Sequence, residues 1–142
     1  MPTRTARLPI DLARQLLAFE ATQGGGLKGS AALSVCAKMR EPLGKVLGVD
    51  GFRSLVARAL AMAGSEVRWL REINIAPDGV VHGVDEVWAK LSHTEIQEGE
   101  IALVAELLGL LVIFIGPYLT ERLLHASWPK LRSLNSKTEG AL

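Results

Sequence analysis

Apolar residues recur every three or four positions along most of the chain, which is the spacing of one face of an α-helix. The first such segment covers about residues 11–22 and ends at three consecutive glycines, and the second covers 28–47. A third begins after Asp50, which is a suitable N-cap residue. The three predicted apolar stripes are Leu12, Leu16 and Phe19; Ala32, Cys36, Met39, Leu43 and Val46; and Phe52, Leu55, Val56, Ala59, Leu60 and Ala63.

Two stretches interrupt this helical pattern. Pro42 lacks the amide that would bond to the carbonyl of Lys38, so we expect the helix to kink there or two short helices to meet. Between residues 73 and 82, apolar residues alternate with polar ones around a Pro-Asp-Gly turn, which predicts a small β-hairpin. Two short strands are marginal alone, so the hairpin must contact the helices or another chain, and we expect Trp69 to anchor it.

The longest helix is predicted to begin after Ser92. Ser92 and Glu95 have the spacing of a capping box, and the acidic residues of the first turns suit the helix dipole. The apolar run at 101–119 contains one charged side chain, Glu106, and the Gly-Pro pair at 116–117 breaks or kinks the helix. After this break an amphipathic segment is expected to present to water Thr120, Glu121, Arg122 and His125.

Residues 101–119 have the length either to span a bilayer or to fill a protein core. Nineteen residues of helix extend about 28 Å, close to the thickness of the hydrocarbon layer. The flanking charges would keep the C-terminus in the cytoplasm and export the first hundred residues, yet we find no secretory signal before them. We therefore favour a soluble domain in which this helix is apolar all round because neighbouring helices surround it. Membrane insertion and an oligomer interface are the alternatives.

The composition fits one globular domain. The chain has 142 residues, 49% of them hydrophobic and 22% charged, with a net charge of +1 and no basic patch, so we expect no nucleic-acid partner. The single cysteine, Cys36, excludes an internal disulfide, suits a reducing compartment and is expected to be buried. We predict a flexible lead at 1–10, one helical domain at 11–129 and a polar, disordered tail at 130–142.

No motif identifies a catalytic, cofactor or metal site, and we expect none. The chain contains no nucleophile elbow, zinc-protease pair, P-loop or dinucleotide fingerprint, and its three histidines lie in different elements. An enzyme would need several ionisable groups around Glu106, and we do not favour that interpretation. A carboxylate in an apolar helix pairs with an arginine, lies at a groove edge or acts as a buried switch. The candidate interaction or switch residues are Trp69, Glu106, Arg122 and Trp128.

Three stretches resemble a group of short, uncharacterised bacterial proteins. They read "GFRSLVARALAMAGSEVRWL", "PDG" and "LVAELLGLLVIFIGPYLTERLLHASWP", and the resemblance covers roughly residues 31–129. It implies a bacterial cytoplasmic protein and brings no activity, fold or functional residue with it.

Together these patterns predict a mainly α fold. We expect a bundle of five to six helices around a central apolar helix at about 95–115, with the hairpin near 73–82. The expected function is a non-enzymatic protein-interaction module, such as an adaptor, a regulatory subunit or a self-assembling signalling domain that binds another protein or another copy of itself. A six-helix, death-fold-like module is one version, based on helix count alone. The alternative is a membrane-inserting or pore-type effector that exposes the 101–119 helix on activation.

Overall fold

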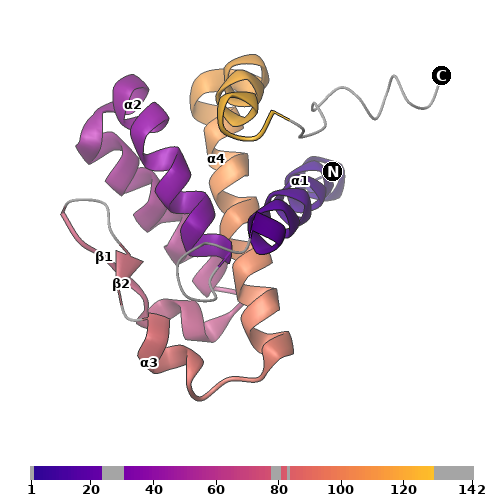
Figure 1. The fold of residues 1–142 in the computed structure, drawn as a ribbon, viewed down its shortest axis with the longest axis vertical. Helices are drawn as coiled ribbons and strands as arrows, with labels where there is room; N and C mark the ends of the chain where they lie inside the picture. Colours follow the sequence, from indigo (N-terminus) through magenta and orange to yellow (C-terminus); the bar gives the residue numbers. More distant parts are fainter. Residues whose placement is uncertain (1, 24–30, 78–80, 83, 130–142) are drawn as a thin grey trace.

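The computed structural model describes residues 2–23, 31–77, 81–82 and 84–129, and this part of the chain is mainly helical, as predicted (Figure 1). It contains four helices rather than the five to six that we expected, together with one short 3-10 helix and one pair of strands. In chain order the elements are α1 (Pro2–Gln23), α2 (Ala31–Gly64), η1 (Arg68–Glu72), β1 (Asn74–Ile75), β2 (Val81–His82), α3 (Val84–Trp88) and α4 (His93–Ser127).

Each of the two long helices contains a break at a glycine. Gly48 in α2 has φ 82° and ψ 162°, and Gly116 in α4 has φ 86° and ψ 158°. Only glycine adopts this region of backbone space readily, because a Cβ atom would clash there. The break in α4 was predicted, and Pro117 contributes to it by disfavouring a helical conformation in the residue before it. Figure 1 places both breaks toward the same end of the long axis of the molecule.

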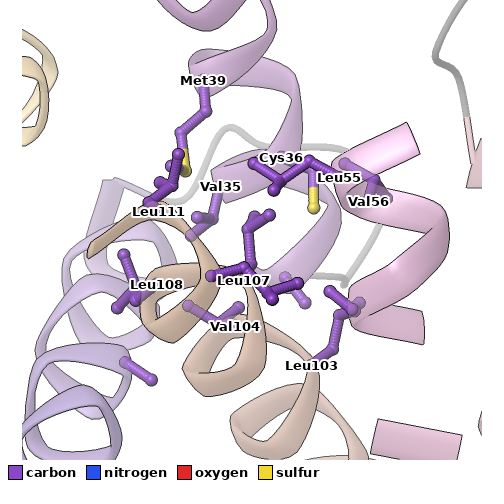
Figure 2. Packing of buried hydrophobic residues seen from close by; sticks show 14 of the residues in the cluster. Val35, Cys36, Met39, Leu55, Val56, Leu103, Val104, Leu107, Leu108 and Leu111 are labelled. Carbon is purple, nitrogen blue, oxygen red and sulfur yellow. The ribbon is translucent and has the colours of Figure 1, made fainter. Parts of the chain in front are cut away.

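The expected interruption at Pro42 does not occur, since α2 continues through it and breaks only at Gly48. Met39 and Leu43, on either side of the proline, are 3% and 1% exposed. Figure 2 shows Met39 beside Leu111 of α4. Burial of these two side chains offsets the missing backbone hydrogen bond, so tertiary packing keeps the helix continuous.

The hydrophobic core gathers around the first half of α4, which packs against both α1 and α2 (Figures 1 and 2). Leu107 and Val104 are fully buried, with side chains of α2 such as Val35 around them. The apolar stripes predicted for residues 28–47 and for the segment after Asp50 are buried as expected, except for Val46. The central position of the α4 run was therefore predicted correctly for its first half.

The first helix begins earlier than its apolar stripe suggested. We expected residues 1–10 to form a flexible lead, but α1 starts at Pro2. Proline is favoured in the first turn of a helix, where its missing amide would have no partner anyway. Leu12 and Leu16 of the predicted stripe are buried and Phe19 is half-buried. The expected tail at 130–142 lies outside the described residues.

The two strands form a short antiparallel pair. Asn74 lies opposite His82, and Ile75 lies opposite Val81. The turn of the predicted hairpin falls on residues 78–80, outside the described part of the chain. The strand pair lies at the side of the molecule next to α2, which β1 contacts (Figure 1).

Candidate interaction surface

The start of α4 is fixed by the predicted capping box. The Ser92 hydroxyl accepts a hydrogen bond from the backbone amide of Glu95 at 3.2 Å, and the Glu95 carboxylate accepts one from the backbone amide of Ser92 at 2.9 Å. Two amides at the helix start that have no partner within the helix are thereby satisfied. This local prediction is confirmed.

The second half of the apolar run in α4 is exposed. Ile113, Phe114 and Tyr118 have 75%, 56% and 70% of their surface accessible to solvent. We expected no face of this helix to see water, and that expectation is wrong from Ile113 onward. These residues lie on both sides of the break at Gly116, where α4 changes direction.

A second group of exposed apolar residues flanks the other break. Val46 and Val49, on either side of Gly48, are 45% and 59% exposed, although Val46 was expected to join the buried stripe of its helix. The bends of α2 and α4 lie toward the same end of the molecule (Figure 1), and each of the exposed apolar residues named above is within three positions of one of these breaks in the sequence. We call this surface the apolar end, and it consists of Val46, Val49, Ile113, Phe114 and Tyr118.

By length and composition α4 alone, among the described helices, could cross a membrane. Its most apolar 18-residue window has a mean hydropathy of 2.2, and 33% of that window is buried inside the domain. The buried share includes the core residues around Leu107, and the exposed share includes Ile113 and Phe114 of the apolar end. The same helix therefore supplies both the centre of the core and an uncovered apolar surface.

The candidate residue Arg122 lies one turn beyond the apolar end. Its guanidinium donates a hydrogen bond to the Tyr118 hydroxyl at 3.2 Å and lies 5.6 Å from the centre of the tyrosine ring. Arg122 is exposed, as expected, and His125 is half-buried beside Glu121 at 4.0 Å. Thr120 was expected to face water but is 1% exposed, and its hydroxyl has no hydrogen-bond partner among the described residues.

Among the described residues, the charge that acts on Glu106 is the carboxylate of Glu66 rather than an arginine. The Glu106 side chain is partly buried, and no hydrogen bond or ion pair joins it to another described residue. Burial raises the pKa of the Glu106 carboxyl above its ordinary value, and the negative charge of Glu66 raises it further. The arginine partner that we considered is absent from the described structure, and Glu106 is less buried than a core switch would be.

Trp69 joins the segment after α2 to the first turns of α4. Its indole N–H donates to the backbone carbonyl of Glu95 at 2.9 Å, and its ring packs edge-to-face against Trp88 with 6.5 Å between ring centres. A Cβ atom at Gly99 would overlap the Trp69 ring, so glycine is required at that position. These contacts join Trp69 to α4 and to Trp88, and its expected anchoring of the hairpin stays a prediction. The matching role of Gly99 had no signal in the sequence.

Trp128 is 4% exposed and belongs to a polar cluster that sequence reasoning missed, in which Glu20 is also buried and Lys38 is exposed. Its indole N–H donates to the Glu20 carboxylate at 2.8 Å, and the same carboxylate forms an ion pair with Lys38 at 2.7 Å. The Lys38 ammonium also lies 5.5 Å from the centre of the Trp128 ring. This Glu20–Lys38–Trp128 cluster ties the end of α4 to α1 and α2.

A second long-range polar contact joins α4 to the start of α2. The buried Glu100 carboxylate accepts a hydrogen bond from the backbone amide of Ala32 at 3.1 Å. An anionic acceptor is favourable there because the first amides of a helix have no partner within the helix and carry partial positive charge. Glu100 therefore helps to fix the packing of α2 on α4.

The described residues hold no arrangement with evident catalytic or metal-binding chemistry. Cys36 is buried, as expected, and burial raises the pKa of its thiol to about 12, so the reactive thiolate is strongly disfavoured. No group of three or more His, Cys, Asp or Glu side chains in the described ranges is placed to hold a metal ion. The apolar end remains as the candidate site, because its large apolar side chains are exposed to solvent.

Comparisons with known proteins identify no relative, since no family model, curated protein or solved structure matches the chain. The resemblance to short bacterial proteins therefore stays a prediction.

Proposed function

We propose that this chain is a non-enzymatic interaction module of the bacterial cytoplasm that docks onto a partner through its apolar end. The observation that carries the proposal is the exposure of Ile113, Phe114 and Tyr118 at 56% or more on a helix whose other half is the core. A concentrated group of exposed apolar side chains in a soluble domain marks a surface that another molecule covers.

The helical architecture supports the signalling-domain version of this proposal. Since α2 and α4 each consist of two helical segments joined at a glycine, the described chain contains six helical segments when these are counted separately. Six helical segments are typical of death-fold-like modules, which act by binding other proteins or by self-assembly. This support comes from fold-level analogy and assigns no specific partner.

Site-specific photocrosslinking tests whether the apolar end contacts a partner. A benzoylphenylalanine in place of Phe114 is expected to give a defined adduct with protein or lipid after irradiation of cells that contain the full chain. The same photoreactive residue in place of Met62 is the control, because Met62 is an exposed apolar residue at 39%, near the far end of α2. Equal adducts at both positions, or none at position 114, would contradict the proposal.

A membrane-inserting effector is the second candidate, and the hydropathy of α4 is the observation in its favour. In that version residues 101–119 leave the domain on activation. Doing so would uncover Leu103, Val104 and Leu107, together with the residues that surround them. The surrounding side chains that α4 leaves behind would then face water, at a cost of roughly 1.5 to 3 kcal/mol each, so insertion needs a trigger that offsets this cost.

A further inference from the structure

The exposed residues around Gly116 belong to a stretch without charge. No Asp, Glu, Lys, Arg or His lies between Glu106 and Glu121, and the second half of this stretch protrudes at the break in α4. Moving Ile113, Phe114 and Tyr118 into an apolar phase would therefore bury no ionised group of that stretch. This matters because charged side chains inside a membrane are costly.

The Tyr118–Arg122 pair has the chemistry of the membrane–water boundary. Tyrosine combines an apolar ring with a polar hydroxyl and is enriched at the level of the lipid headgroups. Here the ring is 70% exposed while the hydroxyl is held by the Arg122 guanidinium at 3.2 Å. An arginine one helical turn behind the apolar residues can keep its charge among phosphates while its stem lies against them.

The α2 break adds a second protruding turn at the same end of the molecule. Val46 and Val49 are exposed there, and the charged residues beside them, Lys45 and Asp50, are exposed as well. Since one is basic and the other acidic, this turn has no net charge to attract an anionic surface. Attraction at the apolar end is therefore expected to come from apolar contact more than from charge.

We propose that the apolar end inserts into the headgroup-level interface of a lipid bilayer while the rest of the domain remains folded above it. This inference rests on the proposed function, because it names the partner of the same surface. It differs from a membrane-spanning helix, since the buried half of α4 stays in the core.

A second copy of the chain fits this surface less well. The five exposed side chains offer on the order of 600 Å², whereas a stable protein interface buries about 800 Å² on each partner. Two protruding turns would also cover only part of each other. A bilayer can surround a protruding turn on all sides, so it covers more of the same residues.

Vesicle co-sedimentation of the full chain is the test. Wild-type protein is expected to pellet with phosphatidylcholine vesicles, with little gain from added phosphatidylserine and little loss at high salt. Phe114→Glu is expected to lower the partition coefficient about tenfold or more, because it removes a large apolar group and adds a charge. Met62→Glu, an equivalent change at an exposed apolar position outside the apolar end, is expected to bind like wild type.

Fluorescence quenching locates the inserted residues. A tryptophan introduced by Phe114→Trp is expected to be quenched by brominated phospholipids, and one introduced by Met62→Trp is not, since Met62 lies about 21 Å of helix beyond the α2 break. Circular dichroism and thermal unfolding confirm that each variant is folded. Equal quenching at both positions would overturn the proposal.

The remaining outcomes separate the lipid partner from the proposed function. If wild type ignores vesicles but forms an oligomer or protein complex that Phe114→Glu abolishes, the docking function stands and the lipid partner is wrong. If Phe114→Glu changes neither vesicle binding nor complex formation, the docking function and the lipid partner are both wrong. If vesicle-bound protein resists extraction at alkaline pH, it spans the bilayer, and the peripheral mode is overturned.

Discussion

The two halves of the apolar run in α4 have similar composition and opposite environments. Leu107 and Leu108 are at most 1% exposed, whereas Ile113 and Phe114, fewer than two turns further on, are 75% and 56% exposed. Hydropathy reports that a segment avoids water, but it does not report what covers it. The first half is covered by α1 and α2, whereas Ile113 and Phe114, just before the break in α4, keep most of their surface accessible to solvent.

The largest difference in stability between the two halves is expected from truncating one aliphatic side chain in each environment. Leu107→Ala removes a fully buried side chain and is expected to lower the free energy of unfolding by about 2–5 kcal/mol. Ile113→Ala is expected to change it by less than about 0.5 kcal/mol, because the side chain already faces water. Urea unfolding of both variants measures the difference. Comparable losses would show that Ile113 is also buried in the free protein.

The next largest change in stability is expected at Gly116, the glycine that divides the two halves. Gly116→Ala is expected to destabilise the domain by roughly 1–3 kcal/mol, because φ 86° and ψ 158° suit only glycine. Gly109, within the helix, has no atom within 4 Å of a built Cβ, so Gly109→Ala is expected to stabilise by up to about 1 kcal/mol. Thermal unfolding compares the two variants. A stabilising Gly116→Ala would mean that α4 is straight in solution.

The smallest change in stability is expected at Glu106, the carboxylate in the first half of the run. Since the pKa of Glu106 is raised in the folded protein, its ionised form destabilises the native state above that pKa. Glu106→Gln is expected to stabilise the protein modestly at neutral pH, and the gain is expected to vanish below about pH 4.5, where the residue is protonated in both states. Unfolding measured across this pH range checks it.

The matched control for this effect is Glu98→Gln, which removes a carboxylate at an exposed position of the same helix. A similar pH-dependent gain for both variants would attribute the effect to the net charge of α4 rather than to burial beside Glu66.

Local signals in the sequence predicted the parts of the fold that depend on neighbouring residues. The Ser92–Glu95 capping box and the Gly-Pro break at 116–117 both follow from interactions within four residues. Pro42 shows the limit of such signals, because contacts of Met39 and Leu43 with the core decide that α2 continues.

The candidate site was less predictable for the same reason. The glutamates that matter most, Glu20 and Glu100, contact residues 108 and 68 positions away in sequence, so no spacing rule could reveal them. Sequence reasoning selected Glu106 because its neighbours are apolar, yet this residue faces partly outward beside Glu66. The exposure of Ile113 likewise depends on where α1 and α2 end in space. The spacing of apolar residues along the sequence does not predict those positions.

The Glu20–Lys38–Trp128 cluster also limits when the native contacts can form during synthesis of the chain. Glu20 leaves the ribosome early, but the indole that binds it is made 108 residues later. The start of α2 similarly waits for Glu100. Helices α1 and α2 therefore emerge with their apolar stripes uncovered, and native packing is completed only when nearly the whole chain has been translated.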